Sequence, residues 1–254
     1  MLEKFRQIKT REIKELNNLK KKGSFPAPLN ENRPDFRAAI SGNTAGIIAE
    51  IKKASPSRGI IREDMGVGQI AELYAANGAS AISVLTERDY FRGDLRDLNR
   101  ASEPGIPLLR KDFILDPVQI EHTAAFPASA VLLIVKFIDN TKKLAELIRL
   151  SEKLGLQAVV EIFSSGELDA ARQAGAKIIQ VNNRNLDTLE TDLNRSRTLA
   201  GEKQNGETWI CASGITERKQ CTEMHGLKFD ACLIGTSVMT ARNPGDKLAE
   251  LTGM

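Results

Sequence analysis

The chain has 254 residues, 41% hydrophobic and 27% charged, which is typical of a soluble protein with one large α/β domain or two small ones. Its 36 basic and 33 acidic residues give a net charge of +3, which suits anionic small molecules and is too weak to indicate a nucleic-acid partner. No apolar run reaches the roughly 18 residues of a membrane span, so we also expect no membrane partner.

The cysteine and histidine residues indicate which cellular compartment to expect and whether to expect a metal site. The cysteines Cys211, Cys221 and Cys232 are odd in number and form no CxxC motif, which is typical of free thiols in a reducing cytosol. The N-terminus has no continuous apolar region, so we expect no signal peptide and a cytoplasmic protein. His122 and His225 are far apart and lack the spacing of metal ligands, so we expect no metal site.

The N-terminal segment is predicted to be helical and separate from the rest of the chain. Between residues 2 and about 20, apolar residues recur at spacings near three, and Lys20–Gly23 supplies basic residues and a stop. Ser24–Pro34 carries three prolines and is expected to be an irregular connector. We therefore divide the chain into an N-terminal helical segment, 1–46, and a second unit, 47–254.

From Ile47 onward, short apolar segments alternate with helical ones. Strands are expected near Ile47–Ile51, Ala81–Leu85, Pro107–Arg110, Ala130–Val135, Ala158–Ile162, Ile178–Val181, Thr208–Cys211 and Ala231–Ile234. Helices are expected near Val67–Asn77, Asp94–Ala101, Pro117–Ala125, Lys142–Leu154, Ser165–Gln173, Asp192–Leu199, Thr216–Met224 and Gly245–Leu251. Eight strand–helix units predict a single (β/α)8 TIM barrel. The alternative is a doubly wound open sheet, although no GxGxxG follows the first strand.

The first strand carries two charges at its end. Side chains alternate along a strand, so Glu50 and Lys52 point the same way, and the loop that begins with Ser55 follows them. Charges beside an apolar strand are costly unless they are paired, and catalytic groups of such barrels lie at the carboxyl ends of strands. The alternative is an edge strand with a solvated salt bridge.

Three further strand ends supply groups suited to proton transfer. Lys111 ends the third strand, Glu161 ends the fifth and Asn182 ends the sixth. A partly dry lysine loses its proton more easily and nearby carboxylates restore it, so such a pair can donate and retrieve protons. Alternatively, Glu161 binds backbone groups, and Lys111 is a rim charge satisfied by Asp112.

The last two strands are followed by small and hydroxyl residues that suit an anion. Ser213 and Gly214 follow the seventh strand, and Gly235 and Thr236 follow the eighth. The loops after these strands form the usual phosphate site of the TIM barrel, because backbone N–H groups can approach an anion there. Each sequence taken alone also fits an ordinary tight turn.

Two other loop residues have a functional and a structural interpretation. Arg184 could bind a phosphate or carboxylate through both guanidinium nitrogens, or it could hold the asparagine-rich loop together. Phe91 could stack on an aromatic substrate or pack against the rim of the barrel.

These motifs together resemble one family. The segments AEIKKASPSRG, VLTERDYFRGDL, LLRKDFILDPVQI, VVEIF, VNNRNL, SGI and LIGTSVM are similar to those of indole-3-glycerol phosphate synthase, in order from about residue 35 to the C-terminus. The resemblance implies a lyase of tryptophan biosynthesis that needs no cofactor. Its substrate would be 1-(2-carboxyphenylamino)-1-deoxyribulose 5-phosphate, which loses carbon dioxide and water as the indole ring closes.

The resemblance also implies roles for the residues. Lys111 would be the principal general acid and Glu161 its partner in proton transfer. Lys52 would bind the substrate carboxylate or act as a second acid, Glu50 would orient the lysines, and Asn182 would hold a substrate hydroxyl. The phosphate would be bound by Ser213, Gly214, Gly235 and Thr236, with Ser55, Phe91 and Arg184 as further substrate contacts. The segment 1–46 would pack over the barrel mouth as a partial lid, and the protein would be a monomer able to associate with other enzymes of the pathway.

The chain departs from the family pattern at two places. Ala212 stands where the family has Glu, which removes one carboxylate from the expected site, and Pro127–Ser129 replaces Gly-Ala-Asp before the fourth strand. Ala212 motivates an alternative function, a non-catalytic or altered paralogue that binds a phosphorylated ligand. A third alternative is a barrel isomerase acting on the preceding intermediate, but that chemistry requires a Cys at the end of the first strand, where this chain has Glu50 and Lys52.

Overall fold

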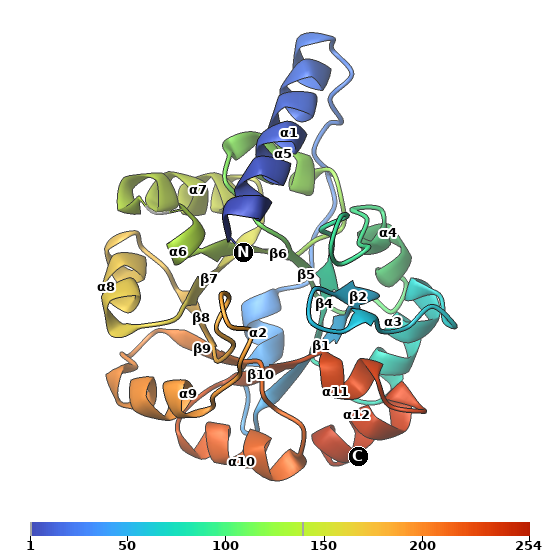
Figure 1. The fold of residues 1–254 in the computed structure, drawn as a ribbon, viewed down its shortest axis with the longest axis vertical. Coiled ribbons are helices and arrows are strands. Elements are labelled where there is room, and N and C mark those ends of the chain that lie inside the picture. The colour runs from blue at the N-terminus through green and yellow to red at the C-terminus, as the bar shows by residue number, and fades with distance from the viewer. Residues whose placement is uncertain (1, 139) are drawn as a thin grey trace.

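A closed barrel of parallel strands lies at the centre of the computed structural model, which describes residues 2–138 and 140–254 (Figure 1). The order around the barrel is β1-β10-β9-β8-β7-β6-β5-β4. These strands are β1 (Gly46–Ile51), β4 (Ala81–Leu85), β5 (Leu108–Lys111), β6 (Ala130–Ile134), β7 (Gln157–Ile162), β8 (Ile178–Asn182), β9 (Thr208–Ala212) and β10 (Ala231–Ile234). The closed order confirms the predicted TIM barrel and rules out the open doubly wound sheet.

Helices surround the barrel as the sequence predicts, with small differences at their ends. They are α3 (Val67–Ala76), α4 (Asp97–Ala101), α5 (Pro117–Ala124), α7 (Thr141–Lys153), α8 (Ser165–Gln173), α9 (Asn194–Leu199), α10 (Arg218–Gly226) and α12 (Pro244–Thr252). The predicted start of α4 at Asp94 is wrong by three residues, because the Asp97 carboxylate accepts a hydrogen bond from the Asp94 amide and holds that stretch in a turn. Among the described residues, no helix is long and apolar enough to cross a membrane.

Several short elements were not predicted. The expected loop after β1 contains a hairpin of β2 (Ala54–Ser55) and β3 (Gly59–Ile60), where Gly59 has a φ of 65°. Glycine adopts this left-handed conformation at little cost, so the chain can reverse there. The other unpredicted elements are α2 (Phe36–Ile40), α6 (Val135–Ile138), the 3-10 turn η1 (Ala200–Glu202) and α11 (Thr236–Met239).

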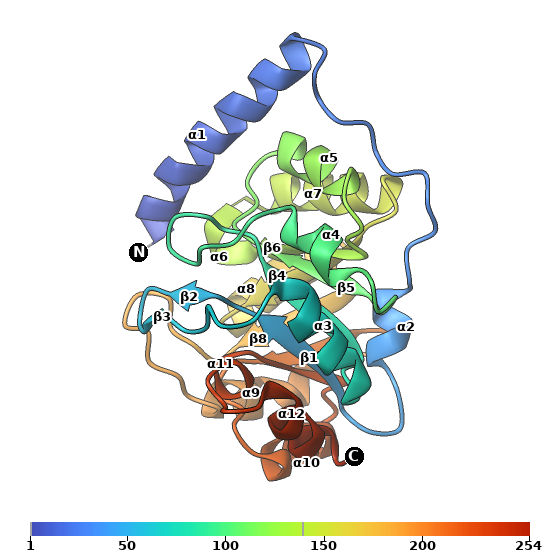
Figure 2. The ribbon, with the colours of Figure 1, turned by 90° about the vertical axis from the view of Figure 1, so that its right-hand side faces the viewer.

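The strands bury both faces, which explains their nearly continuous apolar sequences. One set of side chains packs between the strands and the surrounding helices, and the alternate set fills the barrel interior. On β1, Ile48 belongs to the interior cluster, so Glu50 and Lys52 follow it on the same face. Helix α2 lies at one end of the barrel (Figure 2). Its residues Phe36 and Ile40 are fully buried in that cluster and close this end of the barrel.

Helix α1 (Leu2–Lys21) lies near the opposite end of the barrel, on the side of the β2–β3 hairpin (Figure 2). Its buried residues are Phe5, Lys9 and Leu16. Phe5 stacks on Phe113, with ring centroids 3.9 Å apart and planes 12° apart. The apolar face of α1 is therefore packed against the segment that follows β5.

A buried network of charges joins α1 to β5. Lys9 and Asp112 are each 2% exposed, and Lys9 Nζ lies 2.7 Å from Asp112 Oδ1 and 2.5 Å from Glu12 Oε2. Arg110 Nη2 lies 2.8 Å from the other oxygen of Asp112, to which Thr86 also donates a hydrogen bond at 2.6 Å. Each charge thus has a partner of opposite sign inside the protein, which removes most of the cost of its burial.

The pKa shifts of this network follow from the same contacts. Burial alone would lower the pKa of Lys9, but the carboxylates of Asp112 and Glu12 outweigh it and raise that pKa above its ordinary value. Burial alone would raise the pKa of Asp112, but the charges of Lys9 and Arg110 outweigh it and hold that pKa well below its ordinary range. Both groups are therefore ionised at neutral pH.

Replacing the buried lysine should destabilise the fold. We expect Lys9→Met to lower the free energy of unfolding by about 3 kcal/mol, since it leaves Asp112 with an uncompensated share of buried charge. Urea unfolding followed by circular dichroism measures this change. The matched control is Lys20→Met on the same helix, whose exposed pair with Glu121 should contribute less than about 1 kcal/mol. Equal losses in the two variants would contradict the importance of burial.

Candidate active site

The carboxyl ends of the barrel strands surround a cavity of about 530 Å³. The residues singled out from the sequence lie at the ends of seven of the barrel strands or in the loops that follow these strands. The structure brings all of them to this cavity. They are Glu50, Lys52, Ser55, Phe91, Lys111, Glu161, Asn182, Arg184, Ser213, Gly214, Gly235 and Thr236. A cavity of this size at this end of a TIM barrel is the usual location of the active site.

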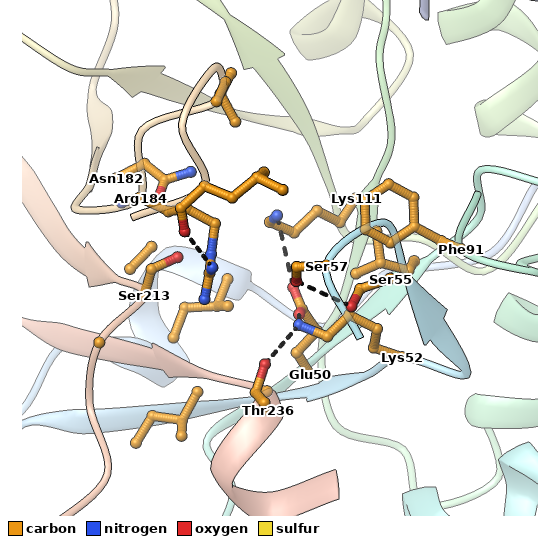
Figure 3. Close-up of a pocket in the computed structure, with 18 of the residues that line it drawn as sticks. Glu50, Lys52, Ser55, Ser57, Phe91, Lys111, Asn182, Arg184, Ser213 and Thr236 are labelled. Atoms are coloured by element: carbon orange, nitrogen blue, oxygen red, sulfur yellow. Dashed lines mark hydrogen bonds and ion pairs between the residues drawn. The ribbon is translucent and has the colours of Figure 1, made fainter. Parts of the chain in front are cut away.

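Glu50 forms ion pairs with two lysines (Figure 3). Its Oε1 lies 3.0 Å from Nζ of Lys52, the residue that follows β1, and its Oε2 lies 3.6 Å from Lys111 Nζ at the end of β5. Lys52 Nζ also donates a hydrogen bond to Thr236 Oγ1 at 3.1 Å. Since Glu50 is only 4% exposed and β1 pairs with strands on both sides, the alternative of a solvated salt bridge on an edge strand is wrong.

The same pairs determine the protonation of Glu50 and Lys111. Burial alone would raise the pKa of Glu50, but Lys52 and Lys111 outweigh it and lower that pKa below its ordinary value. Burial alone would lower the pKa of Lys111, but Glu50 and then Glu161 outweigh it and raise that pKa. At neutral pH Lys111 is therefore a protonated ammonium that can donate a proton. The alternative that Asp112 satisfies Lys111 is wrong, because Asp112 pairs with Lys9 and Arg110.

Glu161 reaches the cavity from the end of β7 and is 1% exposed. Its Oε2 accepts a hydrogen bond from Gln180 Nε2, a side chain of the neighbouring strand β8, so the alternative of a backbone-bonded carboxylate is wrong. Asn182 ends β8, and its Oδ1 accepts a hydrogen bond from the Arg184 amide at 3.0 Å. This contact uses Oδ1 of Asn182, a residue that lines the cavity.

The loop after β9 has an unusual backbone. Ser213 and Gly214 have φ values of 69° and 91°, so two consecutive residues are left-handed, and only the second is a glycine. The side chain of Asn183 holds this loop in place, because its Nδ2 donates hydrogen bonds to the carbonyls of Ala212 at 3.0 Å and Ser213 at 3.1 Å. Strain of this kind at a cavity wall is typical of a binding loop that its surroundings hold in place.

Gly235, at the end of β10, leaves room for Glu50. A Cβ atom on Gly235 would lie 2.5 Å from Glu50 Oε1, which is closer than real contacts allow. The next residue, Thr236, binds Lys52, so the loop after β10 contacts both members of the first ion pair. A residue predicted only as a phosphate contact thus also accommodates the central carboxylate.

Aromatic side chains line the cavity on the side of α1. The ring centroid of Phe91 lies 6.2 Å from that of Phe5 and 6.4 Å from that of Phe113, and all three residues line the cavity. Arg184 also lines the cavity while its Nη1 donates to the Leu189 carbonyl at 2.8 Å (Figure 3). Arg184 therefore holds its own loop and still presents a guanidinium group to a ligand.

Positive charge predominates in the cavity. It is lined by the cations Lys52, Arg58, Lys111, Arg184 and Lys247 and by the carboxylates Glu50, Asp112 and Glu161. Asp112 is neutralised from outside by Lys9 and Arg110, and Lys247 pairs with Glu250. The remaining excess of positive charge suits an anionic ligand.

Ala212 is the last residue of β9, where it lines the cavity and is 1% exposed. Its Cα partners are Asn182 on β8 and Leu233 on β10. Strand β9 thus brings no carboxylate to the cavity, as its sequence predicts.

Sequence reasoning missed several residues of the site. Arg58 and Lys247 lie on the hairpin turn and on α12, where nothing local marks them as cavity residues. Phe5 lies in the predicted N-terminal helix and Phe113 directly follows a run of charged residues, and neither position marks a cavity residue. Gln180 could have been found, because Asn182 faces inward and side chains two residues apart on a strand share a face.

The arrangement offers proton transfer and anion binding. Among the described residues, no group of three or more His, Cys, Asp or Glu side chains has the geometry to hold a metal ion. A protonated lysine beside two carboxylates can deliver a proton to a developing oxyanion and can be recharged by them.

Removing the central carboxylate should change the titration of Lys111. In Glu50→Gln the pKa of Lys111 should fall relative to the wild type, because the largest charge that raises it is lost while burial remains. NMR titration of isotopically labelled lysine side chains measures this shift. Glu121→Gln, which removes an exposed carboxylate paired with Lys20, is the control and should leave Lys111 unchanged. An unaltered Lys111 pKa in Glu50→Gln would refute the pairing.

Solved structures with low sequence identity share this fold. The chain superposes on 3-hexulose-6-phosphate synthase from Salmonella typhimurium with a TM-score of 0.66 and 14% identity, over 82% of this chain and 97% of that one. It superposes on thiamine phosphate pyrophosphorylase from Pyrococcus furiosus with a TM-score of 0.61 and 14% identity, over 86% and 96%. These similarities concern the barrel alone.

Sequence comparisons are more specific. The family model for indole-3-glycerol phosphate synthase matches residues 2–251. The indole-3-glycerol phosphate synthase of Aquifex aeolicus is 46% identical over 222 residues, which is 86% of each chain. That of Carboxydothermus hydrogenoformans is 37% identical over 262 residues, 98% of each chain. Since these matches cover almost the whole chain, including every strand end that lines the cavity, the protein belongs to the indole-3-glycerol phosphate synthase family.

Proposed function

We propose that the cavity converts 1-(2-carboxyphenylamino)-1-deoxyribulose 5-phosphate to indole-3-glycerol phosphate, a step of tryptophan biosynthesis. The aryl carbon that bears the carboxylate attacks the keto carbon of the sugar, and a proton is placed on the keto oxygen. Carbon dioxide then leaves. The hydroxyl formed from the keto oxygen departs as water while a base removes a proton, and this dehydration completes the indole. The observation that carries the proposal is the buried Glu50 paired with both Lys52 and Lys111 in a member of this family.

Proton transfer is assigned to the lysines and carboxylates. Lys111 is the general acid that protonates the keto oxygen, because its pKa is raised and it is charged before the substrate arrives. Glu161 is its partner and serves as the base in the dehydration. Lys52 binds the substrate carboxylate or acts as the second acid, and Glu50 orients both lysines through its ion pairs with them.

The remaining cavity residues bind and orient the substrate. Ser213, Gly214, Gly235 and Thr236 bind the phosphate, with their backbone N–H groups and hydroxyls as donors. Asn182 holds a sugar hydroxyl, Arg184 binds an anionic group, and Ser55 contacts the substrate from the hairpin. The aromatic wall of Phe91, Phe5 and Phe113 binds the aryl ring.

The proposal extends to the organisation of the protein. We assign residues 1–46 to an N-terminal extension, whose helix α1 packs over the barrel mouth while α2 lies at the opposite end, and residues 47–254 to the barrel that carries the chemistry. The phosphorylated substrate is the partner that the site requires. We further infer a cytoplasmic monomer, able to associate with other enzymes of the pathway.

The reaction itself gives the first test. Purified protein mixed with the synthetic substrate should form a product with indole absorbance and fluorescence, and Lys111→Met should lower kcat by about 100-fold or more, as expected for loss of a general acid. Lys219→Met, which changes a lysine whose side chain is 79% exposed, is the control and should be as active as the wild type. If concentrated wild-type protein forms no product, the proposed activity is refuted.

Ala212 supports a second candidate, a protein that binds the phosphorylated ligand without turnover. Ala212→Glu would restore a carboxylate at the end of β9, and with an active enzyme we expect at most a modest change in kcat. In the wild type Glu50 pairs with Lys52 in a site that has one carboxylate fewer, so Glu50→Gln should cost more in the wild type than in the Ala212→Glu background. Tight ligand binding by calorimetry with turnover only in Ala212→Glu would favour the second candidate, and equal costs of Glu50→Gln in both backgrounds would contradict the compensation.

A further inference from the structure

We propose that Gln180 is a positioning residue that holds the Glu161 carboxylate in its catalytic orientation. The two residues are direct Cα partners on the adjacent strands β7 and β8. Gln180 Nε2 donates a hydrogen bond to Glu161 Oε2, and the two residues are 0% and 1% exposed. The inference rests on the role proposed for Glu161 and adds the group through which that role is maintained.

Gln180 is the hydrogen-bond donor available to this carboxylate. Within the described part of the chain, Glu161 has no other hydrogen bond and no ion pair within 4 Å. Lys111 affects it through charge at longer range, because Glu161 contributes to raising the Lys111 pKa. A buried carboxylate with one strong donor takes its orientation from that donor, since loss of the bond would leave a desolvated charge without a partner.

The geometry also directs the second carboxylate oxygen. With Oε2 bound to the side chain of Gln180 beside it, Oε1 is the oxygen left for the cavity that Glu161 lines. Gln180 does not line the cavity, so it does not touch a ligand there and acts through Glu161. A donor that holds one oxygen of a general base leaves the other free to accept a proton.

Gln180 itself is not optimally satisfied. Its Oε1 is buried without a hydrogen-bond partner in the described structure. Burying this oxygen therefore has a free-energy cost that no hydrogen bond offsets. The interior of the same barrel is otherwise filled largely by apolar side chains. A polar side chain that costs stability here is consistent with a functional contact through its N–H group.

The variant that tests this is Gln180→Met, which keeps the length of the side chain and removes the donor. We expect kcat to fall about tenfold with KM within about twofold of the wild type, because ground-state contacts of the substrate are unchanged. In a Glu161→Ala background the same change should alter kcat by less than about twofold, since the group through which it acts is gone. Ser83→Ala, which removes a different buried polar group without a hydrogen-bond partner, the Ser83 hydroxyl, is the control and should leave kcat unchanged.

A merely structural role predicts a different result. Gln180→Met would then lower kcat by the same factor in both backgrounds, or lower the thermal midpoint without affecting kcat, and either result overturns the inference. If Gln180→Met does not fold, Gln180→Asn, whose amide is one methylene too short to reach, replaces it under the same criteria.

A titration separates this inference from the proposed function. In Gln180→Met the carboxylate is no longer held at its present distance from Lys111, so the pKa of Lys111 measured by NMR should differ from that of the wild type, whether or not the protein turns over substrate. An unchanged Lys111 titration overturns the positioning role. A wild-type protein that forms no indole product refutes the activity and leaves this titration as the deciding measurement.

Discussion

The ion pairs of Glu50 with Lys52 and Lys111 are the constraint on which the rest of the site depends. One buried carboxylate holds two ammonium groups that come from different strands, so their spacing is determined by the barrel and not by flexible loops. Neighbouring features serve this arrangement: Gly235 leaves space for the carboxylate, Thr236 accepts from Lys52, and Glu161 adds further negative charge that acts on Lys111. Lys111 can be both buried and charged because these groups surround it.

A second set of charges, largely buried, connects the same strand end to α1. The network divides into two halves that are each internally neutral, Lys9 with Glu12 on the helix, and Arg110 of β5 with Asp112, which follows that strand. Both halves are joined by the Lys9–Asp112 pair, next to the stacked rings of Phe5 and Phe113. The side chain of Lys111 is thus held by Glu50, and the two residues on either side of it, Arg110 and Asp112, are held by this network.

Much of this could be predicted from the sequence, because the relevant signals are local. Alternating apolar strands and helices gave the barrel, and the two-residue period of a strand placed Glu50 and Lys52 on one face. The contacts that were not predicted join residues far apart in the chain. The pair of Lys9 and Asp112 is an example, because the periodicity of a segment gives no information about its partner. Gln180 is intermediate: its inward direction follows from Asn182, but its bond to Glu161 depends on the register between β7 and β8, which only the closed barrel determines. The β2–β3 hairpin escaped because each of its strands has only two residues.

The excess of positive charge that lines the cavity has a kinetic consequence. Low-dielectric walls focus the field of Lys52, Arg58 and Arg184 toward the opening, so an anionic ligand is drawn in before it makes any contact. Dissolved salt screens such attraction over about 10 Å at 0.1 M, whereas the buried pair of Glu50 and Lys111 is shielded from it. Rising ionic strength should therefore slow capture of the substrate while the chemical step inside the barrel proceeds at its own rate. The two stages of the reaction respond to separate parts of one charge distribution, the exposed rim and the buried centre.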